Sequence, residues 1–116
     1  RIFAMTSSGS VAMWPSYGAV SAAKCALESH IRQLALELAP KEITANAIMA
    51  GVTRTPALEK IPGADEIARR ALQSNPHKRL TKPKDIAELL VTLCHPSTGW
   101  LTGNVLRADG GESIAG

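Results

Sequence analysis

The residues in this sequence with the clearest chemical potential are Tyr17 and Lys24, which stand seven positions apart at the start of a predicted helix. A phenol can donate a hydrogen bond or a proton to an oxygen that gains negative charge, and a nearby ammonium lowers the pKa of that phenol. Seven residues make two helical turns, so the side chains would lie about 20° apart around the axis and roughly 10 Å apart along it. Both can reach into one cleft, although on most helices such a pair is a core-edge ring and a solvated amine.

The composition is that of an ordinary globular domain. The chain has 116 residues, of which 45% are hydrophobic and 20% charged, enough to bury a core. Its net charge of +3 is too small to indicate nucleic-acid binding. No run of about 18 apolar residues occurs, so we expect no membrane span. Cys25 and Cys94 are isolated and lack metal-ligand spacing with any histidine, so we expect no metal site and a reducing, cytoplasmic compartment.

Hydrophobic periodicity predicts strands over 2–5, 43–48 and 104–108, and helices over 17–39, 64–74 and 83–94, with a loop over 49–63. Ser16 is a plausible cap for the first helix, and Pro40 stops it. The first helix should bury the apolar residues that recur along one face, namely Val20, Ala23, Leu27, Ile31, Leu34 and Leu38. The last helix should bury Ile86, Leu89, Leu90 and Leu93.

This alternation of strands and helices predicts an α/β fold with a parallel sheet and crossover helices. Ligands of such sheets bind in the crevice beyond the carboxyl ends of the strands. Ser7 follows the first strand, Gly51 and Thr55 follow the second, and Tyr17 begins the helix between them. We therefore expect these residues to meet at one edge of the sheet.

Four separated motifs resemble one known family. Over nearly its whole length the chain resembles the C-terminal half of the short-chain dehydrogenases/reductases. Typical members carry Tyr-x-x-x-Lys, which would place the tyrosine where this chain has Val20. The longer spacing here, Tyr17-Gly-Ala-Val-Ser-Ala-Ala-Lys24, resembles the enoyl-acyl-carrier-protein reductase branch. Further matches are Asn46-Ala-Ile-Met-Ala-Gly-Val-Thr-Arg-Thr55, parts of 54–79, and the C-terminal segment Leu101-Thr-Gly-Asn-Val-Leu-Arg-Ala-Asp-Gly-Gly111.

The resemblance implies the C-terminal half of a Rossmann-type doubly wound parallel sheet, with 1–116 as part of a single reductase domain. The glycine-rich dinucleotide fingerprint is absent, so we expect the adenine half of the cofactor site to lie upstream of Arg1 and the N-terminal cofactor-binding half to be missing. The implied cofactor is NADPH or NADH. The implied partners are an enoyl substrate bound to acyl-carrier protein or CoA, and further copies of the chain in a homodimer or homotetramer.

Within that resemblance, Tyr17 would donate to the thioester carbonyl of a trans-2-enoyl substrate, and Lys24 would hold the nicotinamide ribose hydroxyls. Ser7 would steady the substrate carbonyl or only cap a loop, with Ser8 and Ser10 as competing candidates. The ordinary structural alternatives are a buried aromatic ring for Tyr17 and a solvated amine for Lys24.

The loop after the second strand would contact the nicotinamide. Gly51 would allow close backbone approach or satisfy a turn. Val52 and Thr53 would offer backbone groups to the carboxamide, and Thr55 its hydroxyl to the carboxamide or pyrophosphate, unless it only caps the loop. Trp14, Met49, Leu58 and Ile61 are candidates for an acyl-chain tunnel or for ordinary packing.

Two rival functions stay open. One is a carbonyl or alcohol oxidoreductase of the same superfamily, such as a 3-ketoacyl thioester reductase. The other is a non-catalytic assembly subunit, against which the presence of both Tyr17 and Lys24 argues. The basic residues Lys78, Arg79, Lys82 and Lys84 could meet an acidic carrier protein, but a charge run is usually a solvated surface.

Overall fold

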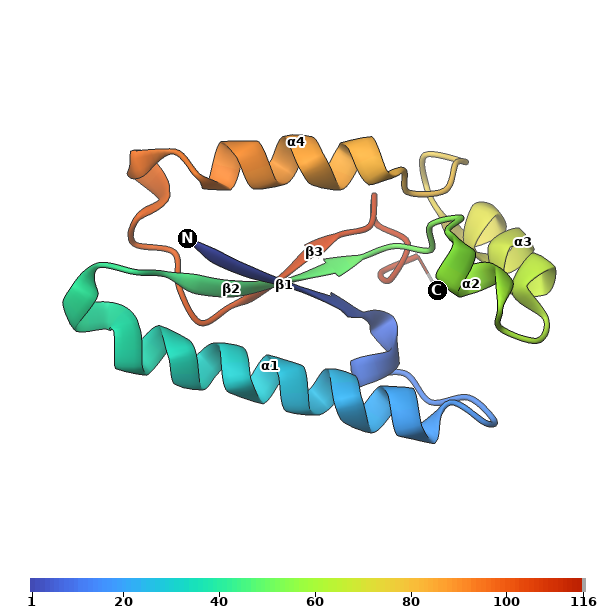
Figure 1. Cartoon of the computed structure of the whole chain (residues 1–116). Helices are drawn as coiled ribbons and strands as arrows, with labels where there is room; N and C mark the ends of the chain where they lie inside the picture. The colour runs from blue at the N-terminus through green and yellow to red at the C-terminus, as the bar shows by residue number, and fades with distance from the viewer. Residues whose placement is uncertain (116) are drawn as a thin grey trace.

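Three apolar segments form a parallel sheet in the computed structural model, which describes residues 1–115 (Figure 1). The strands are β1 (Ile2–Ser7), β2 (Ala45–Ala50) and β3 (Val105–Ala108), in the order β1-β2-β3. Ile2 pairs with Ala45, and Ala47 pairs with Val105. Helices cover both faces of the sheet, and all but the last residue of β2 are buried. The predicted α/β parallel sheet is confirmed.

Helix α1 (Gly18–Leu38) covers one face of the sheet (Figure 1). Ile31 and Ala35 pack against Ala45 and Ala47 of β2. The predicted apolar face is correct for this C-terminal part but wrong near the start, where Ala23 is exposed and the Val20 side chain is 43% exposed. This part of α1 also contacts the short 3-10 turn η1 (Ser8–Ser10), where Cys25 Sγ lies 3.2 Å from Ser10 O.

The start of α1 also differs from the prediction. Ser16 does not cap the helix, because its φ of 65° places it in the left-handed region just before the helix begins. Tyr17 is the N-cap residue, and its carbonyl accepts the first helical hydrogen bond from Ser21 N at 2.9 Å. The left-handed turn at Ser16 is therefore what delivers Tyr17 to the head of α1.

Helix α4 (Pro83–Leu93) covers the opposite face, as Figure 1 shows. Ile86 and Leu93 are buried against Ile48 of β2, and Leu89 and Leu90 pack on the same cluster. The predicted apolar face of this helix is confirmed. Pro83 occupies the first helical turn, where its missing N–H costs no hydrogen bond.

The two remaining α-helices lie beyond the carboxyl ends of the strands (Figure 1). Helix α3 (Ala64–Ser74) has the predicted bounds. The region predicted as a loop contains a short helix, α2 (Pro56–Glu59), which Thr55 caps. Two further 3-10 turns, η2 (Ala39–Lys41) and η3 (Pro96–Thr98), follow α1 and α4. Within residues 1–115, no helix combines the length and the apolar character that crossing a membrane requires.

Candidate active site

A groove of about 690 Å³ opens at the carboxyl edge of the sheet. Parallel strands end on the same side, so the segments that follow β1, β2 and β3 all reach this edge. The lining comes from the β1–α1 connection, the end of β2, helix α3 and the turn after β3, and includes Ser8, Trp14, Met49, Gly51, Val52, Arg107, Asp109 and Glu112. The segments that follow the three strands thus meet at this edge, and Gly51 lines the groove, whereas a common ligand site for Ser7, Tyr17, Gly51 and Thr55 stays a prediction.

Tyr17 lies beside this groove with its ring held on two sides. The ring stacks on Trp14 with centroids 4.4 Å apart and an interplanar angle of 30°. On another side it presses on Gly9, where a Cβ atom would approach Tyr17 Cε1 to 2.3 Å. Among residues 1–115 no hydrogen bond to the Tyr17 hydroxyl is found. The phenol is thus fixed by packing while its hydroxyl stays available to a ligand.

Ser7 lies next to the same ring. A Cβ atom added at Gly9, which would meet the Tyr17 ring, would also lie 3.2 Å from Ser7 Oγ. The Ser7 hydroxyl and the Tyr17 ring therefore lie near the same point. Ser7 Oγ accepts a hydrogen bond from Gly9 N at 3.3 Å and caps η1, which leaves its own proton free to donate. Ser10 is buried and donates to Ser7 O at 3.1 Å, whereas Ser8 lines the groove. Ser7 therefore caps the turn and can still act on a ligand.

Lys24 reaches from α1 to the strand beneath it. Its Nζ donates to the carbonyl of Met5 at 2.9 Å, two residues before Ser7. One turn further along α1, Glu28 accepts a hydrogen bond from the buried Thr6 hydroxyl at 2.6 Å. The ammonium is thereby held close to the carboxyl end of β1, on the same helix as Tyr17.

Several polar groups of the loop after β2 are engaged in hydrogen bonds within the protein. Gly51 N donates to Ala108 O at 3.4 Å, and the Thr53 hydroxyl donates to Gly51 O at 2.9 Å. Thr55 Oγ1 accepts from Leu58 N at 3.3 Å and so caps α2. Gly51 has an ordinary backbone conformation, but a Cβ there would lie 2.5 Å from Thr81 Oγ1. Close packing, and not a turn, therefore requires glycine at this position.

Glu112 is a residue of the groove that the sequence analysis missed. Both of its carboxylate oxygens lie 3.2 Å from Val52 N. Burial raises the pKa of Glu112, and the charge of Asp109 adds to this, although the hydrogen bond from Val52 acts in the opposite direction. The signal that could have revealed it is positional, because Glu112 follows the last strand and so lies at the same edge as Gly51.

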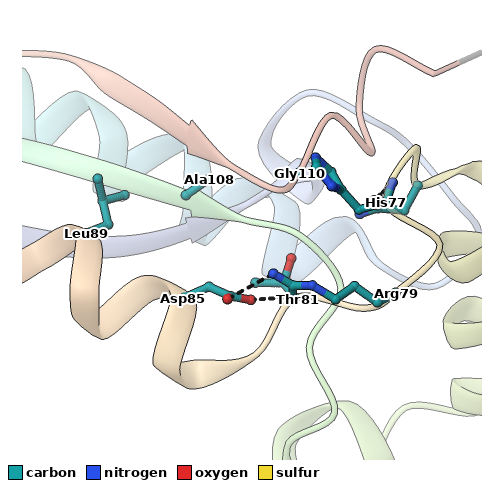
Figure 2. A pocket seen from close by; sticks show the side chains of 8 residues that line it. His77, Arg79, Thr81, Asp85, Leu89, Ala108 and Gly110 are labelled. Atoms are coloured by element: carbon teal, nitrogen blue, oxygen red, sulfur yellow. Dashed lines mark hydrogen bonds and ion pairs between the residues drawn. The ribbon is translucent and has the colours of Figure 1, made fainter.

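A smaller pocket of about 210 Å³ lies on the α4 side of the sheet end, where Figure 2 shows Arg79 and Asp85 joined beside Thr81. Arg79 Nη1 is 2.6 Å from Asp85 Oδ2, and Lys82 N donates to the same oxygen at 2.8 Å. These bonds lower the pKa of Asp85 to about 2. Lys84 pairs with Glu88 at 3.6 Å, and Lys78 donates to Gln73 O. Internal partners for most of the basic run favour a structural surface over a carrier-protein contact.

The described residues offer groups for polarising an oxygen but no metal centre. Within residues 1–115, no three histidine, cysteine, aspartate or glutamate side chains are gathered so that they could hold a metal ion. Near the groove lie a phenol packed on Trp14, which lines the groove, a hydroxyl beside the phenol ring, and an ammonium on the same helix. Such groups stabilise negative charge on a carbonyl oxygen.

Comparison with known proteins identifies the family of the chain. The family model described as enoyl-(acyl carrier protein) reductase matches residues 1–113. The chain belongs to the short-chain dehydrogenase/reductase family. Its members include proteins named for different substrates.

Three similar members of the short-chain dehydrogenase/reductase family illustrate this range. The 7alpha-hydroxysteroid dehydrogenase of Escherichia coli is 35% identical over 78% of the chain and 35% of its own length. The NADH-dependent enoyl-[acyl-carrier-protein] reductase of Synechocystis is 30% identical over 99% of the chain and 45% of its own length. The crystal structure of the Bacillus cereus enoyl-acyl carrier protein reductase with NADP+ superposes with a TM-score of 0.92 at 28% identity, over 99% of the chain and 45% of that structure. The chain thus spans less than half the length of these relatives.

Proposed function

We propose that the protein carrying this chain reduces the trans-2 double bond of an enoyl thioester, bound to acyl-carrier protein or CoA, in fatty-acid or polyketide elongation. The observation that carries the proposal is the Tyr17 hydroxyl, which has no hydrogen-bond partner among residues 1–115, with its ring stacked on the groove residue Trp14 and with Lys24 two turns further along the same helix. Their spacing resembles the enoyl-acyl-carrier-protein reductases, and the family model carries that description. In this proposal residues 1–116 form the C-terminal part of one Rossmann-fold reductase domain.

The residues present fit the nicotinamide end of NADH or NADPH. Lys24 uses one N–H for the Met5 carbonyl, and an ammonium has further donors for ribose hydroxyls. The Thr53 backbone and the capping hydroxyl of Thr55 stand at the end of β2, where a carboxamide or pyrophosphate would meet them. A bound NADH or NADPH supplies the hydride.

Tyr17 has the central part in the proposed chemistry. When a hydride adds to the β-carbon of the substrate, the electron pair of the double bond shifts and negative charge gathers on the thioester carbonyl oxygen. The Tyr17 hydroxyl donates to that oxygen, and the ammonium of Lys24 favours the same charge. Because this charge develops only during the reaction, the interaction lowers the barrier more than it strengthens substrate binding. The α-carbon then takes a proton from solvent.

A second function, reduction of a carbonyl group or oxidation of an alcohol, is favoured by one observation. Ser7 keeps a free hydroxyl proton beside the Tyr17 ring, so a ketone oxygen could receive two hydrogen bonds there. The 35% identity with a hydroxysteroid dehydrogenase is compatible with that reaction. Substrates of this class include 3-ketoacyl thioesters.

The proposed protein works as a homodimer or homotetramer in the cytoplasm. Leu36 on the outer face of α1 is 72% exposed, and Val91 on the outer face of α4 is 75% exposed, so both helices offer apolar surface to another copy. Cys25 and Cys94 are free thiols, which is compatible with a reducing compartment. Analytical ultracentrifugation of the complete gene product tests the assembly, and a monomer at micromolar concentration contradicts it.

The substrate is tested by following NADH and NADPH absorbance with a trans-2-enoyl thioester and a 3-ketoacyl thioester side by side, using the complete gene product. Oxidation of the cofactor with the enoyl substrate alone supports double-bond reduction. Oxidation with the keto substrate alone replaces it with the second function. Oxidation of the cofactor with neither thioester, although a small ketone oxidises NADH or NADPH or a small alcohol reduces NAD+ or NADP+, also overturns the thioester assignment.

A further inference from the structure

The turn after β3 reaches back to the loop after β2 through one side chain. Glu112 accepts the hydrogen bond of Val52 N with both carboxylate oxygens, at 3.2 Å each, across sixty positions of sequence. The side chain is half-buried and lies so close to the loop that a Cβ on Gly51 would be 3.0 Å from Glu112 Oε2. The two segments therefore meet at the wall of the groove.

The turn that carries Glu112 is itself held firmly. The carboxylate of Asp109 accepts hydrogen bonds from Gly111 N at 2.9 Å and Ser113 N at 3.1 Å, on either side of Glu112. Asn75 Nδ2 donates to Asp109 O at 2.9 Å and fixes the turn to the end of α3. Glu112 is thus presented to the loop from a rigid support rather than from a free chain end.

The hydrogen bond from Val52 to Glu112 changes which backbone N–H donors of the loop stay available. Gly51 N is engaged by Ala108, and Val52 N by Glu112. Among residues 1–115, no acceptor is found for the N–H of Thr53. Of the two residues whose backbone groups the resemblance assigns to the carboxamide, Val52 therefore has its N–H already engaged, whereas the N–H of Thr53 has no protein acceptor among residues 1–115.

We propose that Glu112 is a positioning residue, which holds the Val52 N–H so that the neighbouring Thr53 N–H is aimed at the carboxamide of the nicotinamide. The inference rests on the proposed function for the identity of the ligand. The claim that Glu112 orders the loop rests on the hydrogen bonds that Glu112 and Asp109 accept.

The charge state of Glu112 matters to this role because a carboxylate accepts a hydrogen bond more strongly than a neutral acid does. The charged and titratable groups around it are Asp109 in the same turn, Arg107 on β3, and Glu66 and Arg70 on α3, all of which line the groove. His77 lies against Gly110, on the far side of the turn. Burial raises the pKa of Glu112, so its carboxylate protonates at a higher pH than an ordinary glutamate. Acidification should therefore weaken the hold on Val52 and with it the binding of the cofactor.

The test compares Glu112→Ala and Glu112→Gln in the complete gene product, with Glu88→Gln on the exposed side of α4 as matched control. Two readouts are used: the Kd for NADH and NADPH from titration without substrate, and amide hydrogen exchange of Val52 and Thr53 in the ligand-free protein. We expect Glu112→Ala to raise Kd about tenfold and Glu112→Gln about threefold, from the loss of a charge-assisted hydrogen bond and its partial replacement. We expect kcat to change less than Kd, and exchange at Val52 to speed up in both variants.

The pH profile separates positioning from a general loss of folding. Wild-type Kd should rise as pH falls through the pKa of Glu112, whereas the Kd of Glu112→Gln should stay flat over the same range. A wild-type Kd in Glu112→Ala, or unchanged exchange at Val52, overturns the inference while leaving the proposed function intact. A wild-type protein that binds neither NADH nor NADPH overturns the proposed function, and the role of Glu112 in ordering the loop is then decided by the exchange measurement alone.

Discussion

Two segments meet at the carboxyl edge of the sheet and use their polar groups in opposite ways. In the β1–α1 connection, the Tyr17 hydroxyl has no hydrogen-bond partner within residues 1–115, and its ring packs on Trp14 and Gly9. In the loop after β2, by contrast, Gly51, Val52 and Thr53 all take part in hydrogen bonds to the protein. The first segment offers free side chains, and the second offers an ordered backbone.

This difference indicates that the β1–α1 connection and the loop after β2 have different roles. A group that stabilises charge in a transition state must be free of protein partners, yet fixed in place beforehand. Packing achieves this for Tyr17, because stacking immobilises the ring without engaging its hydroxyl. A backbone that has to present one donor in a defined direction needs its neighbouring donors satisfied, and Glu112 and Ala108 do so for the loop. Changes in the two segments should therefore have different consequences.

The largest effect is expected for Tyr17→Phe. The phenylalanine ring keeps the stack on Trp14, and the lost hydroxyl has no protein partner in the described chain, so the melting temperature should stay within about 2 °C of wild type. Activity should fall about 100-fold or more, as when one preorganised donor to an oxyanion is removed. Steady-state kinetics of the complete gene product, beside its thermal melt, measure both. Undiminished kcat would remove Tyr17 from the chemistry.

Gly9→Ala should disturb the same segment by a smaller amount. The new Cβ would lie 2.3 Å from Tyr17 Cε1, so the ring has to swing away from its stack. A displacement of this kind should lower kcat roughly 10- to 100-fold, because catalysis depends on placement to within an ångström. Gly18→Ala is the control, since a Cβ there meets nothing within 4 Å. Equal activity of the two variants, measured side by side, would show that the ring position is not critical.

Gly51→Ala tests the ordered segment, where stability rather than turnover should respond first. Its Cβ would lie 2.5 Å from Thr81 Oγ1 and 3.1 Å from Asp109 Cα, both in buried residues. Overpacking of this kind costs about 1–3 kcal/mol in the free energy of unfolding. Adding Thr81→Ala should recover part of that loss by removing the nearer contact. A double-mutant cycle of denaturant midpoints measures the coupling, and purely additive effects would contradict it.

The smallest effect is expected for Asp85→Asn, outside both segments. Hydrogen bonds from Arg79 and Lys82 hold the pKa of Asp85 at about 2, below the ordinary aspartate value of 3.8. A carboxyl with a lowered folded-state pKa stabilises the fold above its unfolded pKa, and this contribution is lost as pH falls toward about 2. The stability difference between wild type and Asp85→Asn should thus narrow on acidification from pH 4 to pH 2. Because the pair is exposed, the difference should be small and reduced by salt.

That pH series is measured by denaturant unfolding, with Glu59→Gln on α2 as an exposed control. The control should follow the wild-type curve more closely than Asp85→Asn does. A difference between Asp85→Asn and wild type that stays constant down to pH 2 would show that the Arg79–Asp85 bond does not depend on charge.

Local patterns predicted those elements whose surroundings are simple. The apolar residues Ile86, Leu89 and Leu90 of α4 pack as their spacing predicted, because the whole helix lies on the sheet. The same reasoning was wrong for Val20 on α1, where the helix also contacts the turn η1. Periodicity identifies which face of a helix is apolar, but what that face will cover depends on the lengths of neighbouring elements.

The sequence by itself determined the alternation of strands and helices, the parallel order that follows from it, and the placing of Ser7, Tyr17 and Gly51 at one edge. These follow from hydrophobic patterning and from the geometry of parallel strands, both of which are local or general rules. Only the tertiary structure decided that the close packing of Thr81 leaves room for no side chain larger than glycine at position 51. It also decided that Glu112 accepts the hydrogen bond of Val52 N. Such contacts join residues far apart in the chain, and their distances are set by how the helices pack on the sheet rather than by any spacing within the sequence.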